Sequence, residues 1–240
     1  MKNTTHEHIF IREGKYLICS CGKKKLFLEK DNNNNNIYIG ERGDGKAYTV
    51  REDKSRIFLP DEWKTFYDCL KLQQRFTFYI LLNTGARINE ARHIKIEDID
   101  FKNQRIVLRV TKHKKADVHK SHMRTLRVST KCIREIRKHI NDFHLSSNDY
   151  IKILSTPAAN LAMEKALNKT KIKDKELFTI QSIRKTSETW CLALGIDSML
   201  LSKRFGHNLM TMYQHYSQSD AFSYNEKDFI KEFFDDTFID

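Results

Sequence analysis

The chain has 240 residues, of which 40% are hydrophobic, and it contains only 2 Pro and 8 Gly. This is enough for one large domain, or for one domain with a small module, mostly in regular structure. The net charge of +12 and a pI of about 9.4 favour a polyanionic partner, of which nucleic acid is the commonest.

The composition also argues against two other classes of protein. No run of about 18 apolar residues is present, so no membrane-spanning helix is predicted. The first residues contain no apolar stretch typical of a signal peptide. The five cysteines are odd in number and scattered, which argues against a disulfide framework. We therefore expect a cytoplasmic protein without a membrane partner.

Residues 1–56 are predicted to form a small β-rich arm or module. Short β-like runs at 9–11, 16–18, 26–28 and 37–39 are separated by turn residues, and the asparagine run is predicted to be a loop. His6, His8, Cys19 and Cys21 could bind zinc, but the cysteines are separated by one residue where zinc sites use two to four. We prefer the interpretation without metal.

Residues 57–240 are predicted to form the main domain. A helix begins near Pro60, and an almost wholly apolar helix from Gln74 to Asn83 should be buried. Strands are expected at 106–110 and 125–128. Further helices are expected at 131–143, 157–168, 183–194 and 197–205, then a segment carrying Tyr216 and an amphipathic tail at 225–238.

The first block with chemical potential is Thr84-Gly85-Ala86-Arg87-Ile88-Asn89-Glu90. Gly85 allows a sharp turn after the buried helix. Arg87 then projects from a rigid element, where its planar guanidinium can bind a phosphate through two oxygens. Glu90 can hold this arginine or a neighbour. Taken alone, the block is equally compatible with a helix end beside a surface ion pair.

The second feature is a basic hairpin. Between Lys102 and Arg127 the chain has nine Lys or Arg residues and one acidic residue, Asp117. Such a segment suits the backbone of DNA, although a solvated charged loop has the same composition. The candidate DNA-binding residues are Lys114, Lys115, Lys120 and Arg124.

Two further blocks follow near the C-terminus. Residues 178–186 contain Gln181-Ser182-Ile183-Arg184, and residues 200–217 contain Phe205-Gly206-His207 followed by Tyr213 and Tyr216. A phenol oxygen can act as a covalent nucleophile, and arginines can bind the phosphate that it attacks. Each of these blocks alone is weak, because isolated tyrosines are usually core or surface aromatics.

The order and spacing of the blocks, over about residues 58–220, resemble the catalytic domain of tyrosine site-specific recombinases, the phage integrase family. The resemblance implies an α+β fold, in which a mostly helical catalytic domain with a small antiparallel hairpin follows the β-rich module. It also implies cleavage and rejoining of double-stranded DNA through a 3′-phosphotyrosine, by a homotetramer on synapsed sites, without metal or other cofactor. Alternatives are a DNA-binding protein that kept the fold without catalysis, and a type IB topoisomerase-like enzyme.

The resemblance also implies residue roles. The catalytic set would be Arg87, Lys112, Gln181, Arg184, His207 and Tyr216. Tyr216, nine residues after His207, matches the nucleophile spacing of the family, and Tyr213 is its rival. Lys112 would protonate the leaving oxygen, with Lys114 and Lys115 as alternatives. Gln181 stands where the family usually has a histidine, and glutamine cannot titrate near neutral pH.

The C-terminal tail carries five large apolar residues among acidic ones. An exposed helix of this kind would be an apolar liability for a monomer. We expect it to dock on a neighbouring subunit, as the resemblance implies, and the alternative is a helix folded back on its own domain.

Overall fold

The computed structural model describes residues 9–30, 36–41, 45, 47–51, 56–109, 123–206 and 222–238. The chain divides into two compact units. Unit 1 comprises Met1–Arg56 together with Ile172–Leu177, and unit 2 comprises Ile57–Lys171 and Phe178–Asp240.

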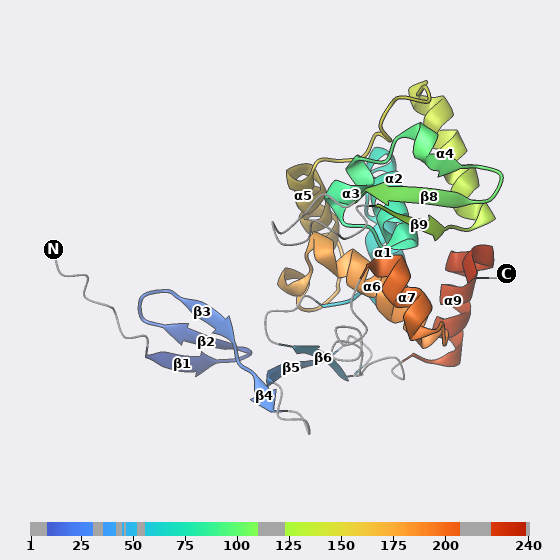
Figure 1. The fold of residues 1–240 in the computed structure, drawn as a ribbon. Coiled ribbons are helices and arrows are strands. Elements are labelled where there is room, and N and C mark those ends of the chain that lie inside the picture. Colours follow the sequence, from blue (N-terminus) through green and yellow to red (C-terminus); the bar gives the residue numbers. More distant parts are fainter. Residues whose placement is uncertain are drawn as a thin grey trace, which may run out of the picture. The chain divides into compact units, whose positions relative to one another are not determined.

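Unit 1 contains two antiparallel three-stranded sheets (Figure 1). The first sheet has the order β1 (Phe10–Glu13), β2 (Tyr16–Cys19), β3 (Lys24–Leu26). The second has the order β4 (Glu29–Lys30), β5 (Asn36–Glu41), β6 (Ala47–Arg51). The prediction of a β-rich N-terminal module is confirmed, although β4 and β6 were not expected from the sequence. The asparagine loop at 31–35 lies outside the described residues.

The segment Ile172–Leu177 belongs to unit 1 because its acidic side chains meet both sheets. Asp174 accepts hydrogen bonds from Lys15 Nζ, from the Tyr48 hydroxyl and, at 2.9 Å, from the Tyr38 hydroxyl. The Tyr16 hydroxyl donates to Glu176 Oε1 at 2.5 Å. Asp174 takes up a left-handed backbone conformation, with φ of 53°. The two sheets are therefore joined to a segment more than a hundred residues downstream.

Unit 2 is mostly helical and carries one small sheet (Figure 1). The sheet has the order β7 (Ile99–Asp100), β8 (Arg105–Arg109), β9 (Met123–Arg127), with both pairs antiparallel. The helices are α1 (Pro60–Asp68), α2 (Leu72–Thr84), α3 (Ile88–Arg92), α4 (Thr130–Phe143), α5 (Thr156–Leu167), α6 (Ile180–Ala193), α7 (Ser198–Phe205) and α9 (Tyr224–Phe234). Single 3-10 turns lie at Ile96–Asp98 and Asp235–Phe238, and a third, Lys175–Leu177, belongs to unit 1.

The core of unit 2 is a cluster of aromatic rings between α1, α6 and α9. Trp190 of α6 is fully buried and donates its indole N–H to the carbonyl of Phe58 at 3.0 Å. Its ring lies edge-on to Phe233 of α9, with ring centres 5.8 Å apart, and Trp63 of α1 contacts both rings. Large buried rings with satisfied polar atoms contribute strongly to stability.

The C-terminal tail is therefore part of its own domain. Besides the ring contacts of Phe233, Asp236 accepts hydrogen bonds from the backbone N–H and the hydroxyl of Thr130, at 2.7 and 2.5 Å. This corrects the expectation that the tail docks on a neighbouring subunit, because Ile230, Phe233 and Phe234 are already buried against their own domain. The expected α+β class is confirmed. Among the helices that the structure describes, none is long and apolar enough to cross a membrane.

Candidate active site

The candidate site begins where α2 ends. Gly85 closes this buried helix with a left-handed φ of 60°, and its N–H donates to Leu81 O at 2.9 Å. A Cβ at this position would lie 2.0 Å from a ring carbon of Phe205. Both the conformation and the close packing require glycine here. The sharp turn brings Arg87 to the N-terminus of α3, as the sequence predicted.

Arg87 binds Glu90 through both its backbone and its side chain. The Arg87 backbone N–H donates to Glu90 Oε2 at 3.0 Å, and its Nη1 donates to Oε1 at 2.8 Å. The expectation that Glu90 holds this arginine is confirmed. The Arg87 side chain is 36% exposed, whereas the Glu90 side chain is 1% exposed. The carboxylate therefore fixes the arginine from the inside and leaves its outer face accessible.

Glu90 also binds a second arginine. Arg124 Nη2, from β9, donates to Glu90 Oε2 at 2.7 Å. Burial alone raises the pKa of Glu90, but the hydrogen bonds and charges of Arg124 and Arg87 outweigh it and lower the pKa to about 2. The carboxylate is thus ionised at any physiological pH, and each of its oxygens is held by a different guanidinium.

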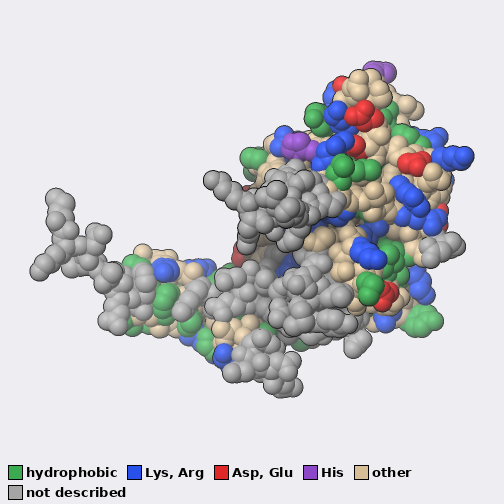
Figure 2. Space-filling view, in the orientation of Figure 1, with side chains coloured by type: hydrophobic (Ala, Val, Ile, Leu, Met, Phe, Trp, Pro, Cys, Tyr) green, Lys and Arg blue, Asp and Glu red, His purple; other side chains and the backbone are tan. Residues whose placement is uncertain are grey.

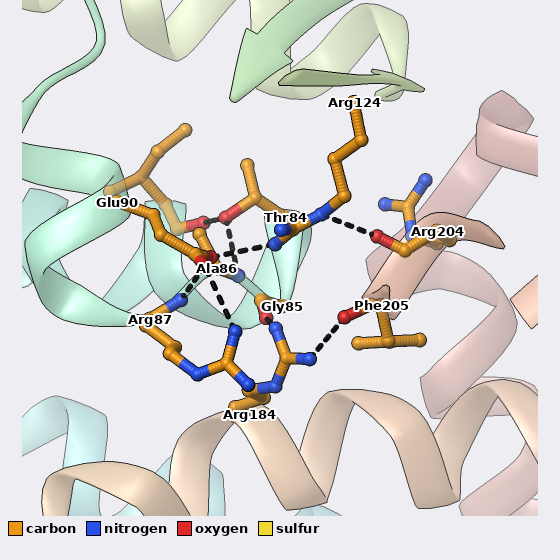
Figure 3. A network of polar contacts seen from close by, with 10 residues as sticks. Thr84, Gly85, Ala86, Arg87, Glu90, Arg124, Arg184, Arg204 and Phe205 are labelled. Atoms are coloured by element: carbon orange, nitrogen blue, oxygen red, sulfur yellow. Dashed lines mark hydrogen bonds and ion pairs between the residues drawn. The ribbon is translucent and has the colours of Figure 1, made fainter. Parts of the chain in front are cut away.

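Arg184 of α6 completes the cluster from below in Figure 3. Its side chain is buried, and its guanidinium donates to Gly85 O at 2.7 Å and to Phe205 O. Burial, followed by the neighbouring charges of Arg87 and Arg124, lowers the Arg184 pKa to about 10. Burial is the larger cause, and the two neighbouring guanidiniums further disfavour a third positive charge beside them.

Arg204 and Phe205, at the end of α7, tie the surrounding elements together. Arg204 is buried and donates to the carbonyls of Asn83 and Arg127, both at 2.6 Å. Its own carbonyl accepts from Arg124 Nε at 3.0 Å. The ends of α2, β9 and α7 therefore meet at one point (Figure 3).

Comparison with known proteins gives the same assignment as the sequence blocks. Residues 58–222 match the phage integrase family. The chain belongs to this family. The expectation from the sequence is confirmed.

Solved recombinases share the fold of this phage integrase family member. The Tn1549 transposon integrase, in complex with a circular intermediate DNA, aligns with 75% of this chain, at 16% identity and a TM-score of 0.58. XerA recombinase aligns with 75% of this chain, at 18% identity and a TM-score of 0.56. XerH recombinase bound to its difH substrate aligns with 76% of this chain, at 18% identity and a TM-score of 0.52. These alignments cover 66%, 65% and 58% of the respective relatives, so this chain matches about two thirds or less of their length. No individually curated protein matches it.

The structure brings some of the expected catalytic residues together and does not describe the others. Arg87 and Arg184 lie in the cluster, and Gln181 is exposed in the first turn of α6, one turn before Arg184. Gly206 ends α7 with φ of 63°, directly before His207 in the sequence. Outside the described residues lie Lys112, Lys114, Lys115, Lys120, His207, Tyr213 and Tyr216.

Two arginines of the site were not expected to have these roles. Arg124 was grouped with the hairpin lysines that we expected to bind DNA, and no role was expected for Arg204. Their partners lie 34 to 121 residues away in the sequence. No spacing rule links such positions, so no local signal could have found them.

The arrangement has the chemistry of an anion site. Arg87 and Arg124 bind the Glu90 carboxylate, and the buried guanidinium of Arg184 lies close enough to interact with it electrostatically, so three positive charges outnumber that carboxylate beside the exposed face of Arg87. Guanidinium groups held in place bind phosphate oxygens strongly. Figure 2 shows further Lys and Arg side chains at many points of the visible face of unit 2. Within the described part of the chain, no His, Cys, Asp and Glu side chains are grouped so as to hold a metal ion.

Proposed function

We propose that this protein is a site-specific DNA recombinase that cleaves and rejoins double-stranded DNA through a 3′-phosphotyrosine. The observation that supports it best is the arginine cluster, in which Arg87 and Arg124 bind Glu90 and Arg184 binds the carbonyl of Gly85 beside them, within a chain of the phage integrase family. The cluster offers fixed positive charge where a phosphate would gain negative charge during reaction.

In the proposed reaction the phenol oxygen of Tyr216 attacks the phosphorus of one DNA strand. The bond from phosphorus to the 5′ oxygen breaks, and the tyrosine is left joined to the 3′ phosphate. Lys112 gives a proton to the departing 5′ oxygen, and the phenol proton passes to solvent or a neighbouring base. Arg87, Arg184 and His207 stabilise the equatorial oxygens. The 5′ hydroxyl of a partner strand then attacks the phosphotyrosine, so the phosphodiester is restored without ATP.

Gln181 would hydrogen-bond the same phosphate or the phenol. It lies on the first turn of α6, at the position that precedes Arg184 by three residues. Residues three apart lie on one face of a helix, so both side chains can approach one ligand. Its amide can donate and accept hydrogen bonds but cannot transfer a proton near neutral pH.

The experiment that tests this proposal also identifies the DNA sequence that the protein cleaves. A pool of nicked duplexes with randomised sequence is incubated with the protein, and DNA that remains attached after detergent denaturation is recovered and sequenced. When a nick lies close to the cleaved phosphate, the short fragment between them, which carries the new 5′ hydroxyl, diffuses away. The strand cannot be rejoined without this hydroxyl, so the covalent complex is trapped. The duplex recovered most often then serves as the substrate for variants.

We expect wild-type protein and Tyr213→Phe to form the adduct and Tyr216→Phe to form none. An adduct with Tyr216→Phe but not with Tyr213→Phe contradicts the choice of nucleophile. Cleavage should persist in EDTA, because arginines supply the charge that a metal would supply, and loss of cleavage restored by Mg²⁺ contradicts the metal-free reaction. DNA binding without any adduct would identify a non-catalytic binder.

The number of subunits in the active complex follows from the proposed reaction. Recombination joins two duplexes, and we propose that a homotetramer holds them. Two intact duplexes that each carry the selected site are mixed, and exchanged products and the mass of the complex are measured. Relaxation of a supercoiled plasmid without exchange would instead favour a topoisomerase-like enzyme.

A further inference from the structure

Arg124 connects three parts of the candidate site. It lies on β9, where its Cα pairs with Leu108 of β8. Its Nη2 donates to Glu90 at 2.7 Å and its Nε donates to Arg204 O at 3.0 Å. One side chain therefore holds the sheet, the helix that starts at Arg87 and the last turn of α7 in a fixed relation (Figure 3).

The contact with Glu90 bears directly on Arg87. Arg124 and the Arg87 backbone N–H both donate to Oε2, which leaves Oε1 to receive Arg87 Nη1. Without Arg124, Oε2 would keep one of these two donors, inside a site where the carboxylate is 1% exposed. A carboxylate that can rotate no longer fixes the guanidinium beside it, and a guanidinium must be held to match the two oxygens of a phosphate.

The contact with Arg204 O supports the turn that follows α7. A Cβ on Gly206 would lie 3.6 Å from Arg124 Nη1 and 3.8 Å from its Cδ, so the Arg124 side chain packs along this left-handed turn. His207 is the next residue in the chain. Arg124 thus supports two of the positions from which catalytic side chains are proposed to act.

Exposure distinguishes this role from DNA binding. The Arg124 side chain is 11% exposed, against 36% for Arg87, and two of its nitrogens already donate to protein oxygens. We propose that Arg124 is a positioning residue for DNA cleavage, which acts through Glu90 on Arg87 and through Arg204 O on the turn at Gly206. The inference rests on the proposed function.

The test compares Arg124→Lys with wild-type protein on the duplex selected above. Lysine keeps the charge but loses the planar fork that reaches two oxygens. We expect the single-turnover rate of adduct formation at saturating DNA to fall at least tenfold. The Kd for DNA and its dependence on salt should stay within twofold, because no phosphate contact is lost.

Arg75→Lys is the matched control. Arg75 of α2 also donates two hydrogen bonds to protein oxygens, the carbonyls of Leu70 and Asp68, at 3.4 and 3.1 Å, but neither of them belongs to Glu90. This variant should cleave within twofold of wild-type. If it loses as much rate as Arg124→Lys, the loss reflects general destabilisation and the inference is wrong.

A double variant tests the route through Glu90. If Arg124 acts partly through Glu90, adding Arg124→Lys should slow Glu90→Gln by a smaller factor than it slows wild-type protein, because the route through Glu90 is already broken and only the contact with Arg204 O remains to be lost. Fully multiplied losses contradict this route.

Where Arg124→Lys melts too low to assay, Arg124→Gln, which keeps an amide donor for one partner, takes its place. A folded variant that cleaves at the wild-type rate overturns the proposal, as does one whose whole defect is a weaker Kd with a shallower salt slope. Absence of an adduct with wild-type protein would contradict the proposed function itself.

Discussion

Glu90 is the residue on which the charge balance of the site depends. It is buried between Arg87 and Arg124, so Glu90→Gln leaves the guanidiniums without their counter-charge. Removing one partner of a buried pair costs about 3–5 kcal/mol, and because Arg87 is 36% exposed we expect the low end, about 3 kcal/mol, at neutral pH. The free energy of unfolding in urea measures this loss. Glu97→Gln is the control, because Glu97 forms an exposed ion pair with Lys95.

The same variant gives a defined pH dependence. The pKa of Glu90 is lowered from 4.5 to about 2 in the folded state, mainly by Arg124 and Arg87 acting against burial. A lowered pKa stabilises the fold above the unfolded-state value, and this contribution is lost as pH falls from about 4.5 towards 2. The difference between wild-type and Glu90→Gln should therefore shrink over this range. An equal difference at pH 7 and pH 3 would contradict the ion pairing.

Gln181 offers a test of how far this site departs from the pattern of the family. If glutamine only donates a hydrogen bond, Gln181→His should keep or raise the cleavage rate, and Gln181→Ala should lower it by less than about 10², the low end for a positioned acid–base group. The histidine variant should also add an inflection near pH 6.5 to the rate profile. An inactive Gln181→His would mean that the site has reorganised around glutamine.

Sequence reasoning reached the residues of this site that lie in local blocks. Gly85, Arg87 and Glu90 form a turn and a helix start, and the periodicity around Arg184 predicted a helix, so these positions followed from local rules. Arg124 could not be assigned in this way, because its partners are set by how β9 packs beside α3 and α7. Side-chain contacts between distant elements depend on tertiary packing, which a single sequence does not display.

At the scale of elements, the long helices and most of the strands were predicted, but β4 and β6 were not. Apolar periodicity and capping residues define a helix such as α2 or α6 from within its own segment. Strands β4 and β6 carry mostly polar or mixed residues, and their pairing with β5 decides their conformation. The tail helix was expected from its pattern, but the pattern could not show that Trp63 and Trp190 in its own domain would cover Phe233.

Asp174 connects the two N-terminal sheets to the segment Ile172–Leu177, and this connection can be tested directly. Asp174→Asn keeps a residue that tolerates the left-handed backbone but removes the charge that Lys15 and two tyrosine hydroxyls bind. We expect backbone amides of β2, β5 and β6 to exchange roughly tenfold faster, while amides of α2 and α6 stay unchanged. Asp149→Asn, which loses a carboxylate bound by Ser146 in unit 2, is the control. Unchanged exchange in β5 and β6 would show that Asp174 does not stabilise these strands.

At the scale of the whole molecule, the net charge of +12 becomes useful only if it is concentrated where DNA lies. We expect the hairpin lysines to bind phosphates, so changing Lys114, Lys115 and Lys120 to Gln together should weaken DNA binding. Each lost phosphate contact lowers the slope of log Kd against log salt by about 0.9, so the slope should fall by about 2–3. Cleavage at saturating DNA should keep its rate, because the arginine cluster is untouched.

The control changes Lys165, Lys169 and Lys171, which are exposed around the end of α5, and so removes the same net charge elsewhere. An equal loss of slope in both triple variants would mean that net charge, and not the hairpin, determines the affinity for DNA.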